Sequence, residues 1–257
     1  MTMKIRIPQK KYFYIVSHKT KTTMKPHLLL SLCLLFIYGI GYSQDKGYIA
    51  LSAGPSFPTG DFGSKDVNNE AAGLANTGVI IDLTYAQKFG KNLGLTLMLR
   101  GQANGVDTDP LLDELFFQEP NVPWQAESGS WGIGGFMGGL YGSFPMGESK
   151  VTFETRAMVG YINATSPEIT ISGNALGQNF WVTTESASGG AFGYLFGAGF
   201  KFGIGEHLGL LLNFDYLGAT PEFVDVRTIT SLGTYTESTY QQKFGTMNVG
   251  VGIGYRW

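Results

Sequence analysis

The chain has 257 residues, and its composition departs from that of a soluble domain because 37 residues are glycine, 14% are aromatic and only 15% are charged. An ordinary soluble domain has about 25% charged residues and about 7% glycine. The 18 phenylalanines and 13 tyrosines exclude a disordered chain, because disorder goes with few aromatic residues. This composition suits a surface that meets lipid.

The charge is divided along the chain. Residues 1–44 contain seven basic residues and no acidic ones, so 11 basic and 20 acidic residues remain in 45–257, a net charge of −9. Binding to nucleic acid requires a basic face. We therefore expect no nucleic-acid partner.

The N-terminal segment has the pattern of a secretory signal peptide. Lys25 precedes an apolar run over 28–40, and small residues follow at 41 and 43, as at a cleavage site. The run is shorter than the about 20 apolar residues of a transmembrane helix. We expect 1–23 to be an over-extended start, 24–43 the signal peptide and 44–257 the mature domain. A long natural n-region is the alternative for 1–23.

From residue 46 onward, apolar residues alternate with small or polar ones. In the last stretch, the odd positions 247–257 are all apolar, whereas the even positions hold Thr, Asn, Gly and Arg. The pattern recurs in 79–85, 93–100, 151–161, 192–202 and 208–216, and is less regular in 47–57 and 130–144. Alternation with period two indicates strands, and successive side chains of a strand point to opposite sides.

About eight strands of roughly ten residues result, the length with which a tilted strand crosses a bilayer. The connections alternate between short ones and long, polar ones at 58–76, 105–129, 165–189 and 218–245, as in bacterial barrels with short periplasmic turns. Because lipid cannot satisfy a free strand edge, the sheet must close. The predicted fold is all-β, an eight-stranded antiparallel transmembrane up-and-down β-barrel over 44–257, in the cell outer membrane. A soluble β-barrel, with the apolar face inward, is the alternative.

The sequence resembles the small outer-membrane β-barrel family, the eight-stranded OmpA/OmpX/OmpW-like group. Residues 54–62 are similar to its first-strand-to-loop segment. The end of the chain is similar to its C-terminal assembly signal, although Trp replaces the usual final Phe; the residues are Val251, Ile253, Tyr255 and Trp257. The resemblance implies insertion by the barrel-assembly machinery. It specifies function poorly, because the family has structural, adhesive and small-solute-handling members.

Aromatic residues at the strand ends are expected to form two girdles at the membrane interfaces. The predicted loop-side girdle is Trp131, Tyr161, Phe192 and Tyr216, and the predicted turn-side girdle is Phe89, Phe153, Phe202 and Trp257.

Seven charged residues fall on the face predicted to line the lumen: Asp82, Arg100, Glu154, Arg156, Lys201, Asp215 and Arg256. An eight-stranded barrel is only wide enough for side chains to fill, and buried charges need partners. We expect the pairs Asp82–Arg156, Glu154–Lys201 and Arg100–Asp215, and a lumen plugged by them. A narrow gated pore is the alternative.

Catalysis is not expected. The mature domain has one histidine, His207, which falls in a predicted periplasmic turn and not at the membrane or the outer rim, where barrel hydrolases place their histidine. Without a second histidine, a zinc site of the usual histidine-rich kind is not expected. We expect no metal and no cofactor. A barrel enzyme acting on lipid or peptide is disfavoured by the histidine count.

The long loops are acidic, with fourteen acidic residues against Lys65, Arg227 and Lys243. Oxygen ligands of this kind suit divalent cations, so we expect contact with lipopolysaccharide through bridging cations, besides contact with the lipid bilayer. Residues 111–117 are apolar enough to form a short amphipathic helix. The predicted function is a structural or surface-interaction role with no surface ligand named. A passive, porin-like conduit or binder for a small apolar solute is the alternative.

Overall fold

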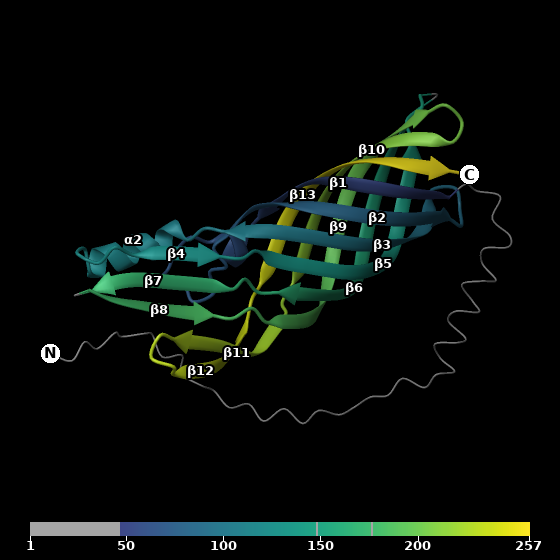
Figure 1. Ribbon diagram of the computed structural model, residues 1–257. Helices are drawn as coiled ribbons and strands as arrows, with labels where there is room; N and C mark the ends of the chain where they lie inside the picture. Colours follow the sequence, from purple (N-terminus) through teal and green to yellow (C-terminus); the bar gives the residue numbers. More distant parts are fainter. Residues whose placement is uncertain (1–46, 148, 176) are drawn as a thin grey trace, which may run out of the picture. The chain divides into compact units, whose positions relative to one another are not determined.

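The structure is a computed structural model that describes residues 47–147, 149–175 and 177–257. The predicted start and signal peptide lie outside the described residues. Eight antiparallel strands form a closed barrel in the order β1-β13-β10-β9-β6-β5-β3-β2 (Figure 1). Their bounds are β1 Tyr48–Pro58, β2 Ala75–Lys88, β3 Leu93–Val106, β5 Trp131–Pro145, β6 Val151–Thr165, β9 Ser188–Ile204, β10 Leu208–Ala219 and β13 Phe244–Arg256.

The apolar faces of the barrel strands point outward, as the alternation predicts. Val79, Val159 and Val251 are 63%, 67% and 61% exposed. Inward-facing neighbours such as Met98 and Met137 are buried. In β5, whose phase the sequence left open, the odd positions are the ones that face the lumen.

An apolar exterior on a closed sheet is the surface of a membrane-spanning barrel. Each barrel strand is hydrogen-bonded on both sides, so no strand edge is left for lipid to satisfy. The soluble alternative predicts the opposite orientation of these faces. The barrel therefore spans the outer membrane, and the short turns after β2, β5 and β9 lie at one end of it.

The long connections build a second sheet, which the sequence analysis treated only as polar loops. Five strands pair in the order β12-β11-β8-β7-β4. Their bounds are β4 Gln125–Ser128, β7 Ile169–Ala175, β8 Gln178–Thr184, β11 Glu222–Thr230 and β12 Tyr235–Gln241. Alternating Ile and Thr residues favour the strand state here, but each strand has only four to nine residues.

Two helices complete the loop side. The 3-10 helix η1 (Gly60–Gly63) follows β1, and α2 (Asp109–Gln118) lies between β3 and β4. The predicted helix around 111–117 is thus confirmed, and its Phe117 is 85% exposed. Among the residues that the structure describes, no helix is both long and apolar enough to cross a membrane.

Because the apolar faces of the barrel strands point outward, an introduced charge should destabilise the protein on the lipid-facing surface and not in the loops. Val251→Arg, near the middle of β13, is expected to lower the free energy of unfolding in lipid vesicles by about 2–4 kcal/mol, because arginine is destabilising on the lipid face. Leu232→Arg, in the turn between β11 and β12 where Leu232 is 88% exposed, is the control and should change little. Urea titration measures both, and an equal effect would contradict the assignment of the lipid-facing surface.

Candidate functional site in the barrel lumen

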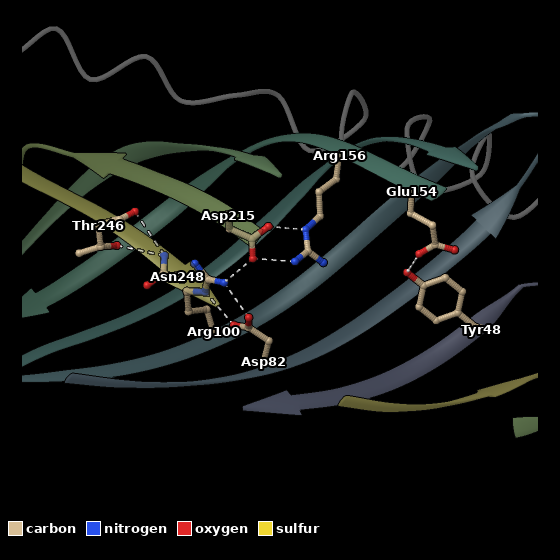
Figure 2. Close-up of polar contacts among 8 residues, drawn as sticks. All are labelled: Tyr48, Asp82, Arg100, Glu154, Arg156, Asp215, Thr246 and Asn248. Carbon is tan, nitrogen blue, oxygen red and sulfur yellow. Dashed lines mark hydrogen bonds and ion pairs between the residues drawn. The ribbon is translucent and has the colours of Figure 1, made fainter. Parts of the chain in front are cut away.

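Four charged side chains form a continuous chain of ion pairs across the lumen, which we call the ion ladder (Figure 2). Arg100 donates from Nε and Nη2 to the two oxygens of Asp82, at 2.7 and 2.6 Å, and from Nη2 to Asp215 at 3.2 Å. Arg156 donates to both oxygens of Asp215, at 2.7 and 2.6 Å. Because β3 and β10 stand four places apart in the ring of eight strands, the Arg100–Asp215 pair joins opposite walls.

Two acids and two bases make the ion ladder neutral, and pairing offsets the cost of burial. The side chains of Asp82, Arg100 and Asp215 are 0–2% exposed. Charges buried to this degree are stable only when they are paired and hydrogen-bonded. Planar guanidinium groups that bind carboxylates through two nitrogens meet that requirement.

Gly197 of β9 leaves the space that the Arg156–Asp215 pair occupies. It lies between the two partners in register, opposite Arg156 of β6 and Asp215 of β10. A Cβ added at Gly197 would lie 2.0 Å from Asp215 Oδ1 and 2.9 Å from Arg156 Nε. A larger residue at this position therefore excludes the observed ion pair.

A second group of polar side chains, the lower cluster, lies nearer the turn side. The Glu154 carboxylate accepts hydrogen bonds from the Tyr48 hydroxyl at 3.0 Å, from the Tyr141 hydroxyl at 2.8 Å and from Lys201 Nζ at 2.5 Å. Lys201 Nζ also lies 4.5 Å from the centre of the Tyr48 ring. Since β1 and β6 are four places apart in the ring, the Tyr48–Glu154 bond also joins opposite walls.

The structure differs from the sequence expectation in part of the pairing. The pairs Glu154–Lys201 and Arg100–Asp215 are present. The predicted Asp82–Arg156 pair is wrong, because β2 and β3 are neighbours and Asp82 lies opposite Arg100 in register. The two tyrosines of the lower cluster were not predicted, although they fall on the inward face of their strands.

Arg256 does not join the lumen network, contrary to the prediction. Its side chain donates to the carbonyls of Glu206 and Gly205, at 2.9 and 2.7 Å. Those residues belong to the turn between β9 and β10, so Arg256 stabilises the end of the barrel and not its interior. Alternation placed Arg256 on the inward face of β13 but did not show that this part of the strand lies level with the β9–β10 turn.

At the loop side, aromatic side chains fill the lumen and form the apical cluster. Phe62 of η1 is fully buried, with its ring centre 5.7 Å from Trp131 of β5 and 4.4 Å from Phe244 of β13. Phe223 lies 5.9 Å from Trp131 and 5.2 Å from Tyr240. Because β5 and β13 are again four places apart, this cluster spans the lumen from wall to wall.

Trp131 therefore belongs to the apical cluster and not to the predicted loop-side girdle. It is 5% exposed, and its indole Nε1 donates to the Gly73 carbonyl at 2.9 Å. A buried indole needs such an acceptor, which the folded β1–β2 connection supplies. The glycines around Trp131 concealed which face of β5 it occupies.

Lys65 fixes the position of the β1–β2 connection, which is the segment that carries Phe62. Its ammonium donates to the carbonyls of Leu74 and Ala75, both at 3.1 Å, and pairs with Asp107 at 3.2 Å. Leu74 has a φ of 50°, an unfavourable conformation for leucine. Its carbonyl also accepts from the Asp107 amide at 2.8 Å, so local hydrogen bonds offset that strain.

The other predicted girdle residues lie on the outer surface. Tyr161 and Phe192 are exposed and in edge-to-face contact, 6.2 Å between ring centres, and Tyr216 is partly buried. On the turn side, Phe89, Phe202 and Trp257 are exposed and Phe153 is partly buried. The predicted assembly-signal residues also point outward: Val251, Ile253, Tyr255 and Trp257.

Outside the lumen, the structure places no reactive constellation around His207. Its ring stacks on Tyr255, and its Nδ1 lies 3.2 Å from the Arg256 carbonyl. Across the described ranges, no group of three metal-ligating side chains occurs.

No protein-family model matches the sequence, and no curated protein matches it either. Several solved structures align with most of this chain. The attachment invasion locus protein Ail of Yersinia pestis is 15% identical over 84% of this chain and 100% of that chain, with a TM-score of 0.41. A major outer membrane protein of Thermus thermophilus is 11% identical over 82% of this chain and 99% of that chain, with a TM-score of 0.47. Neisserial surface protein A is 9% identical, with 82% and 99% covered and a TM-score of 0.41. Identities this low carry over no residue role.

Asp215 is the acid that both arginines of the ion ladder share, and we expect its removal to have a large effect on stability. Asp215→Asn leaves Arg100 and Arg156 without their common partner, and we expect the free energy of unfolding to fall by about 3–5 kcal/mol. Glu237→Gln, which breaks the exposed Arg227–Glu237 pair, is the control and should cost about 0–1 kcal/mol. Equal values in urea titrations would show that the ion ladder does not contribute to stability.

The Gly197→Ala variant tests whether the Arg156–Asp215 ion pair needs the space that Gly197 leaves empty. The added methyl group collides with the Asp215 carboxylate, and we expect a loss of about 1–3 kcal/mol from overpacking. Gly134→Ala on β5 is the matched control, because a Cβ there meets nothing within 4 Å. The same urea titrations compare the two, and a Gly197→Ala protein as stable as the control would refute the steric role of Gly197.

Proposed function

We propose that this protein is a closed, non-conducting outer-membrane barrel that presents an interaction surface outside the membrane. The observation that carries the proposal is that side chains join opposite walls of the lumen at three levels. These are the apical cluster, the ion ladder and the Tyr48–Glu154 bond of the lower cluster.

The space between two of these levels, the ion ladder and the lower cluster, supports closure. A cavity between the ion ladder and the lower cluster, lined by Thr96, Glu154 and Arg156 among others, has a volume of about 10 Å³. That volume accommodates one water molecule. A hydrated ion or a sugar needs far more room, so passage would require the cross-lumen contacts to break.

The five-stranded sheet supports the surface role. Its outer strands, β4 and β12, each pair on one side only, and unpaired strand edges are surfaces to which a partner strand can add. Large apolar side chains are exposed there: Trp181, Leu232 and Tyr235. We further propose that acidic loop residues contact lipopolysaccharide through divalent cations, and that the barrel-assembly machinery reads the outward side chains of β13.

A conduit for a small apolar solute is less well supported. The charged side chains of the ion ladder and lower cluster occupy the middle of the lumen, and an apolar solute gains nothing from displacing them. The described contacts of His207 likewise give no support to an enzyme, and we propose no catalytic role.

Planar-bilayer recordings test the closed lumen. We expect no stable conductance steps from the wild-type chain, and none from Phe62→Ala, because the ion ladder remains. The quadruple variant Phe62→Ala, Tyr48→Ala, Arg100→Ala, Asp215→Ala removes the cross-lumen contact at each of the three levels and should conduct, which verifies that inserted barrels are detected. Stable large steps from the wild type would refute the proposal.

The surface role is tested by shortening the β11–β12 hairpin. Thr228 and Thr236 are directly paired, so replacing 229–235 with Asn-Gly closes the hairpin with a two-residue turn. Bacteria displaying this variant should adhere less than wild type to arrays of immobilised matrix proteins and glycans, at equal surface expression. Undiminished adhesion would contradict a role for this end of the sheet.

A further inference from the structure

A groove of about 570 Å³ crosses the lipid-facing surface of β1, β13, β10 and β9. Its loop-side wall is a row of outward side chains paired in register: Phe57, Met247, Tyr216 and Phe196. Its turn-side wall is the next outward row: Val249, Phe214 and Ala198. The small side chain of Ala198 keeps one end of the groove open.

The floor of the groove is continuous backbone. Between the two walls runs the row of Asn248, Asp215 and Gly197, paired in register. The side chains of Asn248 and Asp215 point into the lumen and are buried. The groove therefore lies directly outside the ion ladder, and the hydrogen-bonded strands separate the two.

The loop-side rim of the groove is polar. Tyr194 and Tyr216 lie side by side, 6.2 Å between ring centres. The Tyr216 hydroxyl and Thr59 Oγ1 both lie next to Gly245, each 3.0 Å from the position that a Cβ there would take. Tyrosine hydroxyls at this height suit the boundary between acyl chains and headgroups.

We propose that this groove binds one acyl chain of a lipopolysaccharide molecule. The groove is part of the lipid-facing surface, so its occupant must come from the membrane and must be apolar along most of its length. Its polar rim faces the loop side, which is the outer leaflet, where lipopolysaccharide is the lipid. The proposal rests on the outer-membrane placement and deepens the proposed lipopolysaccharide contact, but it depends neither on the closed lumen nor on the cation-bridged loops.

Lipid retention measured by native mass spectrometry tests the groove. The full barrel is purified in mild detergent with EDTA, which removes divalent cations and so the proposed contact at the acidic loops. It is then incubated with lipopolysaccharide or, separately, with phosphatidylethanolamine. Wild type should retain one lipopolysaccharide molecule and little phosphatidylethanolamine.

Ala198→Phe fills the open end of the groove and should lower lipopolysaccharide retention by about tenfold. Gly134→Phe adds the same ring to the lipid face of β5, away from the groove, and should leave retention unchanged. Ala198→Leu serves if the phenylalanine variant does not fold, as judged by resistance to SDS in unheated gels. Equal retention by wild type and a folded Ala198 variant, or equal retention of phosphatidylethanolamine, would overturn the proposal. Failure of the closed-lumen proposal would instead appear as conductance, with lipid retention unaffected.

Discussion

The structure depends on one constraint: inside a membrane, every backbone N–H and C=O must find its partner within the protein. The eight barrel strands meet it by closing the sheet. Closure then divides each strand into an outward face that must be apolar and an inward face that is shielded from lipid. Charged residues in these strands can be tolerated only inside, and only in pairs.

The inward pairs connect strands that are not neighbours. Arg100 with Asp215 and Tyr48 with Glu154 each join walls four strands apart. Neighbouring strands are already joined by backbone hydrogen bonds, so links between opposite walls add resistance to flattening of the barrel, which backbone pairing alone does not supply. Gly197 makes room for the part of the ion ladder formed by Arg156 and Asp215, because this ion pair occupies the volume that a side chain at position 197 would take.

In the regularly alternating strands, alternation alone was enough to predict which residues face lipid, because a period of two leaves only two choices for each strand. The Asp82–Arg100 pair could also have been predicted, since the short connection after β2 fixes the register of the β2–β3 hairpin. The position of Trp131 could not, because glycines on both faces of β5 hide its phase. The second sheet was not predicted, because its strands are short and rich in Thr and Ser, a composition that loops share.

The apical cluster and the ion ladder each contribute to the stability of the other. The apical cluster excludes solvent from the loop side of the lumen, and ion pairs are stronger where water is excluded. Loss of Phe62 would therefore admit solvent to the Asp82–Arg100 pair and weaken it without touching it. In the other direction, Arg100 and Asp215 hold β3 and β10 together, and so hold the barrel walls at the spacing across which Trp131, Phe62 and Phe244 fit. An apolar cluster and an ionic cluster in one lumen thus stabilise each other.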